Sequence, residues 1–369
     1  MAPKKKVEKR RLSPFQRFLK YIYRIAVALS AVIVALFVVW KLAIRPPEVA
    51  QPTAPAIPRE SPLPGSGEGA GGAPGGEEST LQRRDQTYTF LLIAQDQVSS
   101  STDTLIAVTY DVPNKKVGMV SIPRDTLVDR KVGPYRYYKI NAAYGNAETN
   151  SPGSGIGELK DAVSDLLGIP IDYYVMVDVP SFVRIVDAVG GVDFEVPVYM
   201  DYDAPDQDLH IHYEAKLYRG LSGKQVMEIA RCRKNTIWKG GSYTLYDAYP
   251  DAEIGRTRTQ QALLKAIAKK LISWNSIPRI TKLAGIVNES VETNMPLDDM
   301  LFFAQNGITV DLAAGLTTAT FPGDGTVTYR GVDYCYLYDK AAALELINTL
   351  LNPYTTEVTE DMADIFQIN

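Results

Sequence analysis

Residues 87–122 read TYTFLLIAQDQVSSSTDTLIAVTYDVPNKKVGMVSI, and this stretch decides the fold. Its first nine residues form a largely apolar run, which is typical of a strand buried on both faces. A second strand is expected over 104–110, a turn over 111–114 and a third strand over 116–122. If the second and third strands pair as a hairpin, the end of the third lies beside the start of the second.

Polar residues flank these strands where they would share one edge of a sheet. Asp96 follows the first strand, and Asp103 opens the second. Arg124 and Asp125 follow the third strand, within the sequence SIPRDT. Two carboxylates that can hold a divalent cation, beside an arginine, indicate a site that handles phosphate. An ordinary surface salt bridge is the alternative, and these segments alone leave both interpretations open.

The rest of the chain mixes helix and strand patterns. Helices are expected over 157–167, 180–189, 260–271, 297–305 and 341–351, and strands over 173–178, 192–198 and 317–321. Helices alternating with strands predict an α/β fold, a layered α-β-α sandwich with a mixed central sheet. The apolar share of 46% fits a globular protein, and the charged share of 22% excludes wholesale disorder.

The N-terminal region differs from the rest in charge and hydropathy. Residues 1–45 carry eleven Lys/Arg and one acid, so their balance is +10 and residues 46–369 carry −14. A basic head on an acidic body does not indicate nucleic-acid binding. Residues 25–44 form an apolar segment with only two polar interruptions, which predicts one transmembrane helix. Nine Lys/Arg precede it, so the positive-inside rule places the N-terminus in the cytoplasm and the body outside the cell.

These features divide the chain into segments. The divisions are a basic cytoplasmic tail (1–24), the transmembrane helix (25–44), a Pro/Gly-rich linker (45–83), an extracellular folded domain (84–355) and a C-terminal tail (356–369). A cleavable signal peptide is the alternative to a retained anchor. Its apolar core would be unusually long, and no small-x-small cleavage site follows it.

Two cysteines, Cys232 and Cys335, are present. Outside the cell they could pair and close a long loop, and the predicted topology favours this disulfide. The alternative is two buried thiols, or exposed thiols of no consequence.

Several short motifs follow one another in a distinctive order along the folded domain. They are TDT (102–104), SIPRDT (121–126), KINAA (139–143), LGIPIDYYV (167–175), VDAVGGV (186–192), RCR (231–233), and GR (255–256) followed by QQ (260–261). In order and spacing the chain resembles the LytR-CpsA-Psr family of bacterial cell-wall ligases over residues 88–275. Members also resemble it in having a short cytoplasmic tail, one span and an external catalytic domain.

The resemblance implies a phosphotransferase that acts outside the cell. Family members take a glycopolymer, such as teichoic acid, from a polyprenyl-pyrophosphate carrier and join it to peptidoglycan through a phosphodiester. This chemistry needs cations to offset the pyrophosphate charge, an apolar slot for the isoprenoid tail, and an acceptor hydroxyl held in line. The apolar faces of the helices at 157–167, 180–189 and 260–271 are candidates for the slot, although such faces are commonly ordinary core.

The resemblance also implies a metal site. Asp96 and Asp103 match the family's metal ligands, and Glu253 stands where an aspartate is common. Hard oxygen ligands favour Mg²⁺, with Mn²⁺ as the second choice. A zinc site on His210 and His212, the two histidines of the chain, is a less favoured alternative.

The resemblance assigns catalytic and substrate-binding roles to further residues. Four arginines match the family's cationic positions: Arg124, Arg231, Arg233 and Arg256. A guanidinium suits pyrophosphate because it donates parallel hydrogen bonds and keeps its charge. Gln260 matches a glutamine that would bind a phosphate or sugar oxygen, and Asp125 is expected to orient Arg124.

The chain departs from the family pattern in three places. Ser101 replaces an arginine, Glu253 replaces an aspartate, and Thr259 stands where an arginine precedes the two glutamines, with Arg258 one position early. The segment 237–250 is a mobile flap or a long loop. These departures keep two alternatives open: a non-catalytic scaffold that binds polyprenyl phosphate or wall polymer, and a pyrophosphatase that uses water as the acceptor.

Overall fold

The computed structural model describes residues 45–49, 81–95, 102–204, 209–239, 242–272, 285, 289 and 291–364. The chain separates into two units, residues 1–46 and 47–369. The predicted transmembrane helix at 25–44 lies outside the described residues, as does most of the predicted linker. Among the helices within the described ranges, none combines the length and the hydropathy needed to cross a membrane.

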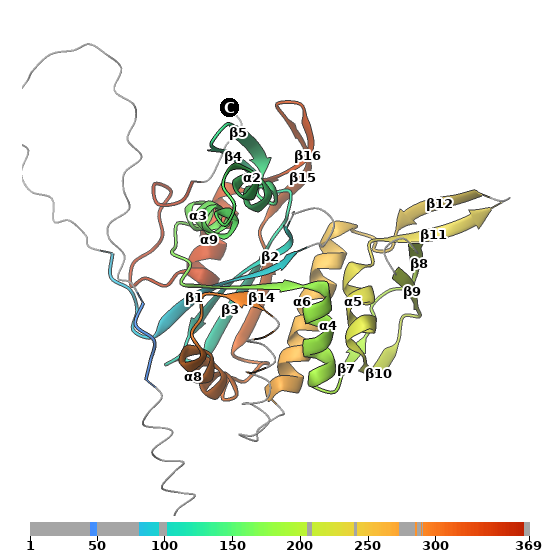
Figure 1. The fold of residues 1–369 in the computed structure, drawn as a ribbon, viewed down its shortest axis with the longest axis horizontal. Helices are drawn as coiled ribbons and strands as arrows, with labels where there is room; N and C mark the ends of the chain where they lie inside the picture. The colour runs from blue at the N-terminus through green and yellow to red at the C-terminus, as the bar shows by residue number, and fades with distance from the viewer. Residues whose placement is uncertain are drawn as a thin grey trace, which may run out of the picture. The chain divides into compact units, whose positions relative to one another are not determined.

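A six-stranded mixed sheet forms the centre of the second unit (Figure 1). In spatial order its strands are β13 (Glu292–Thr293), β6 (Tyr173–Asp178), β1 (Thr87–Gln95), β2 (Thr102–Asp111), β3 (Lys116–Ile122) and β14 (Leu316–Thr320). The pairs β1–β6 and β3–β14 are parallel, and the other neighbours are antiparallel. The predicted mixed sheet is therefore confirmed.

The hairpin that the sequence predicted joins β2 to β3. Leu105 pairs with Ile122, and the Asn114 backbone N–H donates to Asp111 Oδ1 at 3.0 Å to close the turn. The start of β2 thus lies beside the end of β3. This register brings position 103 to the same edge as Arg124.

One face of the sheet is closed by helices. Alternate strand residues, among them Leu91, Leu105 and Val120, pack in one buried cluster with Leu159 of α3 (Gly155–Leu167). The helix predicted at 341–351 consists of α9 (Lys340–Leu346) and the π-helical turn η2 (Ile347–Leu351), which join the same cluster. The helix α2 (Ala142–Asn150) and the hairpin of β4 (Leu127–Val132) and β5 (Tyr135–Lys139) lie next to α3. The apolar face of α3 is therefore core, not a lipid slot.

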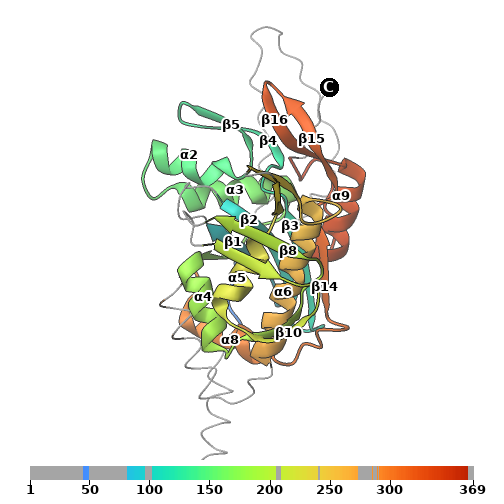
Figure 2. The same cartoon turned by 90° about the vertical axis from the view of Figure 1, so that its right-hand side faces the viewer.

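The opposite face carries a second set of helices (Figures 1 and 2). These are α4 (Val179–Ala188), α5 (Gly223–Arg231), α6 (Glu253–Ile272) and α8 (Leu297–Gly307). The ring of Phe303 in α8 lies 4.9 Å from those of Tyr88 and Phe90, so α8 covers one end of this face. Helices on both faces of one sheet give the layered arrangement that the sequence predicted.

Four further antiparallel strand pairs lie outside the central sheet. They are β7 (Val192–Glu195) with β10 (Leu217–Leu221), β8 (Met200–Ala204) with β9 (Leu209–Tyr213), β11 (Lys234–Lys239) with β12 (Ser242–Asp247), and β15 (Gly323–Tyr329) with β16 (Val332–Tyr338). The strand predicted at 192–198 is shorter than expected. The segment 237–250, left open between a flap and a long loop, contains most of the β11–β12 hairpin.

A buried ion pair fixes β1 against the start of β6. Arg83 Nη1 donates to Asp172 Oδ1 at 2.8 Å, and both side chains are almost wholly buried, at 2% and 7% exposed. The second oxygen, Asp172 Oδ2, accepts from the backbone N–H and the hydroxyl of Thr89 at 2.8 and 2.9 Å. Asp172 belongs to the GIPIDYYV motif, and these contacts give it a structural role.

We predict that Asp172→Ala lowers the free energy of unfolding by about 3–5 kcal/mol, because it leaves the Arg83 charge buried without its partner. Urea unfolding of the purified protein measures the change. The matched control is Glu360→Ala, which removes the carboxylate of an ion pair with Lys340 whose acidic side chain is 63% exposed. Glu360→Ala should lower the free energy of unfolding by only about 0–1 kcal/mol. Equal losses in both variants would contradict the role assigned to Asp172.

The predicted disulfide is wrong: Cys232 and Cys335 are both free and buried. Cys232 packs among residues of α4, α5 and α6, whereas Cys335 lies on β16. Each thiol is thus enclosed in a different part of the fold. Burial raises the pKa of Cys232 to about 12 and also raises the pKa of Cys335.

Both thiols should therefore be unreactive toward a thiol-specific reagent in the folded protein, since the thiolate is the reactive form. After unfolding in urea without reductant, both should react. Counting labelled cysteines by mass spectrometry tests this, and a count that rises only after reduction would restore the disulfide.

Candidate functional site

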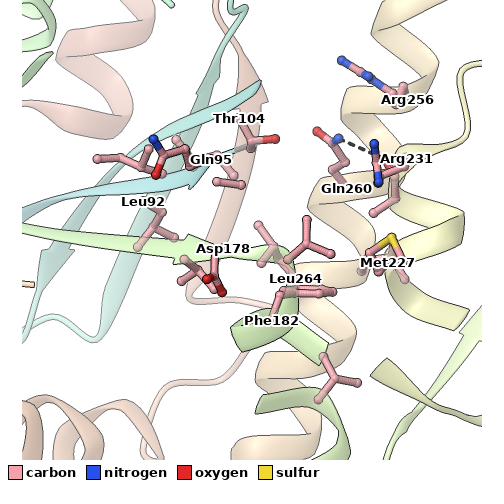
Figure 3. Close-up of a pocket in the computed structure, with 18 of the residues that line it drawn as sticks. Leu92, Gln95, Thr104, Asp178, Phe182, Met227, Arg231, Arg256, Gln260 and Leu264 are labelled. Atoms are coloured by element: carbon pink, nitrogen blue, oxygen red, sulfur yellow. Dashed lines mark hydrogen bonds between the residues drawn. The ribbon is translucent and has the colours of Figure 1, made fainter. Parts of the chain in front are cut away.

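A cavity of about 530 Å³ lies between the sheet and the helices α4, α5 and α6 (Figure 3). Its sheet side is formed by Leu92, Ala94, Thr104, Ile106, Val175 and Val177. Its helix side is formed by Phe182, Ile185, Met227, Ala230, Leu263, Leu264 and Ile267. The lining is therefore largely apolar along both sides.

The strand register explains why this face is apolar. Along β1, Leu91 and Ile93 belong to the closed core, so Leu92 and Ala94 face the other way. In the parallel pairing, Leu92 is opposite Val175. Of the three helices proposed to form a slot, α4 and α6 line the cavity, but α3 lies on the opposite face of the sheet.

All four predicted arginines line this same cavity, together with Lys234. We call the set Arg124, Arg231, Arg233, Lys234 and Arg256 the cationic side. They come from four places in the chain: the loop after β3, the end of α5, the segment into β11, and the first turn of α6. Figure 3 shows Arg231, Arg256 and Gln260 near one another, with Phe182 and Leu264 farther along the cavity. The predicted cationic residues are thus brought together.

One acidic residue, Glu253, pairs with two arginines of the cationic side. Glu253 forms an ion pair with Arg256 in the same helix, and its other oxygen lies 3.7 Å from Arg233 Nε. The Arg256 side chain is 11% exposed, and its Nε is buried with no hydrogen-bond partner. A buried donor without a partner is rare, and a ligand oxygen could satisfy it.

Asp125 holds a third member. Its carboxylate lies 3.6 Å from Arg124 Nε and 3.1 Å from Lys139 Nζ. This geometry agrees with the orienting role expected for Asp125, which stays a prediction. Sequence reasoning gave Lys139 no role, although it opens the KINAA motif.

The two neighbouring glutamines point in different directions. Gln260 lines the cavity, and its Nε2 donates to the backbone oxygen of Ala230 at 3.1 Å. Gln261 Nε2 donates to Ser121 Oγ and to Ala319 O, both at 2.8 Å, and so holds α6 on the sheet. Arg258 forms an ion pair with Asp251 and is not among the cavity residues, as expected for a residue rotated about 100° around the helix.

The metal ligands stay a prediction. Asp96 lies outside the described residues, and Asp103 is described only as a position in β2. Within the ranges that the structure describes, no group of three or more His, Cys, Asp or Glu is arranged to hold a metal ion. Glu253, the third predicted ligand, is engaged with the two arginines described above.

The two histidines contact aspartates on the β8–β9 hairpin. His212 Nδ1 lies 2.7 Å from Asp201, and His210 Nδ1 lies 3.0 Å from Asp203. The hydrogen bond to Asp201 raises the pKa of His212. Both histidines thus have aspartate partners on the same hairpin, and zinc binding there stays an untested alternative.

Sequence reasoning missed several cavity residues. Gln95, Thr104 and Asp178 lie at the ends of β1, β2 and β6 and line the cavity (Figure 3). Asp178 also caps α4 by accepting the Ser181 backbone N–H at 2.8 Å. The signal that could have found them is their position at strand ends that share one edge of the sheet.

Comparison with known proteins places this arrangement among related structures. The polyisoprenyl-teichoic acid–peptidoglycan teichoic acid transferase TagV of Bacillus subtilis is 31% identical over 260 residues, which cover 69% of this chain and 59% of TagV. TagU of Bacillus anthracis, named for the same transfer, is 28% identical over 72% of this chain and 79% of its own length. The crystal structure of B. subtilis TagV superposes with a TM-score of 0.58 at 27% identity, covering 72% of this chain and 95% of that one.

The family profile described as the LytR_cpsA_psr family matches residues 73–352, which include the sheet, the cavity and the cationic side. The motifs, the fold and this match agree. The chain belongs to the LytR-CpsA-Psr family.

Proposed function

We propose that this protein is a phosphotransferase that moves a glycopolymer from a polyprenyl-pyrophosphate carrier onto peptidoglycan. One observation carries the proposal: a single cavity joins an apolar lining to a cationic side. A polyprenyl pyrophosphate has the same division, with a hydrocarbon tail and a multiply charged head. The names of the relatives TagV and TagU support teichoic acid as the class of glycopolymer.

The apolar part of the cavity suits the isoprenoid tail. Phe182, Leu264 and Ile267 lie opposite the apolar strand residues. A hydrocarbon chain placed between them would therefore be shielded from water on both sides. Burial of this kind stabilises by about 25 cal/mol per Å² of apolar surface. The tail would supply binding energy and hold the head in register with the arginines.

The cationic side suits the pyrophosphate. Arg231 and Arg256 would donate to its oxygens, and the unpartnered Nε of Arg256 provides one donor already oriented. Glu253 and Asp125 fix the neighbouring guanidinium groups before the substrate arrives. Donors held in place in this way lower the barrier where negative charge develops.

The reaction that fits is attack by a peptidoglycan hydroxyl on the phosphorus that carries the glycan. A new phosphorus–oxygen bond forms to the acceptor, and the bond to the bridging pyrophosphate oxygen breaks. Polyprenyl phosphate leaves, and the hydroxyl proton is released. The pyrophosphate bond supplies the driving force, so no nucleotide is needed.

Mg²⁺ is the proposed cofactor, and Asp96 and Asp103 would be its ligands. When bound, it would offset charge on the pyrophosphate. Glu253 serves the arginines in the arrangement described, so the two aspartates are the stronger ligand candidates. The sequence supports placing the domain outside the cell, tethered through residues 25–44.

We predict that Arg231→Ala lowers the rate of transfer by about 10²–10³-fold, because one donor to the developing charge is lost. The assay supplies polyprenyl-pyrophosphate oligosaccharide and a peptidoglycan fragment, and mass spectrometry quantifies the phosphodiester adduct. The control is Arg219→Ala, which removes an arginine on β10 that is 78% exposed and outside the cavity. Wild-type rates in Arg231→Ala would contradict the proposed role.

The same assay separates the alternatives. Lipid retained by the wild-type protein with no adduct would indicate a binding scaffold. A free phosphorylated glycan in place of the adduct would indicate a pyrophosphatase.

We further expect EDTA to abolish transfer and Mg²⁺ to restore it. Asp103→Asn should change the dependence of the rate on Mg²⁺ concentration, because the loss of a ligand raises the concentration needed for half of the maximal rate. Asp203→Asn, on the β8–β9 hairpin, is the matched control and should leave that dependence unchanged. Transfer that continues at full rate in EDTA would exclude the metal from the proposal.

A further inference from the structure

The β11–β12 hairpin extends beyond the body of the domain (Figure 1). It exposes apolar side chains to solvent. Its exposed large apolar residues are Ile237, Trp238, Tyr243, Leu245 and Tyr246. Trp238 is 71% exposed and Tyr243 is 61% exposed, and their ring centroids are 5.4 Å apart. Aromatic side chains exposed in a pair like this are unusual on a surface that meets only water.

The exposed residues occupy both faces of the hairpin. Side chains alternate along a strand, and Trp238 is paired with Tyr243, so these two share a face with Leu245. Ile237 and Tyr246 lie on the other face. A protein or a saccharide that packs on a flat ribbon covers one face, whereas a lipid interface surrounds a hairpin on both. The two-sided exposure therefore favours lipid.

The base of the hairpin is firmly held. Asn235, in β11, donates to the Tyr199 backbone oxygen at 3.0 Å and accepts from the Asp201 N–H at 2.8 Å. The Lys234 ammonium lies 2.7 Å from Asp247 across the first pair. These contacts fix the direction in which Trp238 and Tyr243 point away from the domain.

The hairpin is continuous with the cavity. Lys234 belongs to the cationic side, and by the strand alternation it lies on the same face of the hairpin as Trp238. Arg233 and Lys234 are partly exposed, so this part of the cavity wall meets solvent. An apolar strip thus begins at the cavity and runs outward along one face.

The chain outside the described domain bears on what covers this strip. The predicted linker, residues 45–83, is rich in Pro and Gly and follows the predicted transmembrane helix in the sequence. A domain joined to a membrane-spanning helix by this length of chain would be held at a bilayer. Because residues 46–369 carry a net charge of −14, contact with the bilayer must come from apolar and aromatic groups and not from net charge.

We propose that the β11–β12 hairpin docks into the interface of the phospholipid membrane through Trp238, Tyr243, Leu245, Ile237 and Tyr246. Tyr and Trp rings suit the boundary between headgroups and acyl chains, since each has an apolar body and a polar atom. Docking holds the cationic side of the cavity at the lipid surface. This goes beyond the proposed function, since it concerns where the domain meets the bilayer, whatever reaction follows.

The test uses the full-length chain with Trp40→Phe and Trp274→Phe, which leaves Trp238 as its single tryptophan. The protein is reconstituted in phosphatidylcholine vesicles with or without brominated acyl chains. We expect bromination to lower Trp238 emission at least twofold, with little dependence on salt. Adding Tyr243→Ser and Leu245→Ser should remove most of that quenching.

The control places a tryptophan at a position of similar exposure elsewhere, using Tyr334→Trp in a chain without other tryptophans. Tyr334 is 72% exposed on the β15–β16 hairpin and should show no quenching. Equal quenching at both positions, or none at Trp238, overturns the proposal. So does a Trp238 signal that follows the protein-to-lipid ratio alone, which indicates a second copy. A signal that responds to a soluble peptidoglycan fragment but not to bromination indicates a saccharide surface instead. None of these readouts depends on transfer activity.

Discussion

The parallel pairing of β1 with β6 is the constraint on which the rest of the structure depends. Side chains alternate along a strand, so a shift of one residue would exchange Leu91 for Leu92 and turn the cavity lining into the core. The carboxylate of Asp172 opposes that shift, because both of its oxygens accept from Arg83 and one of them also accepts from the N–H and hydroxyl of Thr89. A buried ion pair is a weak source of net stability, but a register that leaves it broken is strongly disfavoured. Asp172 thus helps to determine the shape of the cavity, although it does not line the cavity.

Once the register is set, the two faces of the sheet have different tasks. One face packs against α3, α9 and η2 as a dry core. The other is covered by α8 at one end and stands away from α4, α5 and α6 at the other, which leaves the cavity. Cations gathered at such a cavity repel one another, and Glu253 and Asp125 offset part of that repulsion while they fix the guanidinium groups. The acids therefore belong to the design of the site even where they bind no metal.

The sequence predicted the long buried elements best. The bounds of β1, β3 and β6 agree with prediction because each is an apolar run with polar residues at its ends. The hairpins β8–β9 and β11–β12 were missed, although the sequence carries signals for both: β9 alternates apolar and polar residues (LHIHY), and Gly240 and Gly241 separate β11 from β12. The gathering of Arg124, Arg231 and Arg256 followed from the family resemblance and not from spacing. The slot was beyond prediction, because α3, α4 and α6 each offered an apolar face and only the fold decides that α4 and α6 line the cavity whereas α3 packs in the core.

The proposed lipid substrate would impose a cost that the arrangement of apolar surface helps to lower. Each methylene of an isoprenoid tail that crosses water costs about 0.8 kcal/mol, so a long tail cannot leave a bilayer for a distant cavity at a useful rate. This cost falls if the tail stays in contact with apolar protein surface on its way from the bilayer to the cavity. Trp238 and Leu245 extend such a surface outward from Lys234, while Leu92 and Phe182 continue it inside. The arginines stand between these two surfaces, where the pyrophosphate head would stop while the tail passes inward. On this arrangement, the position of the charged groups sets how far the lipid enters, and the apolar groups on either side determine whether it can enter at all.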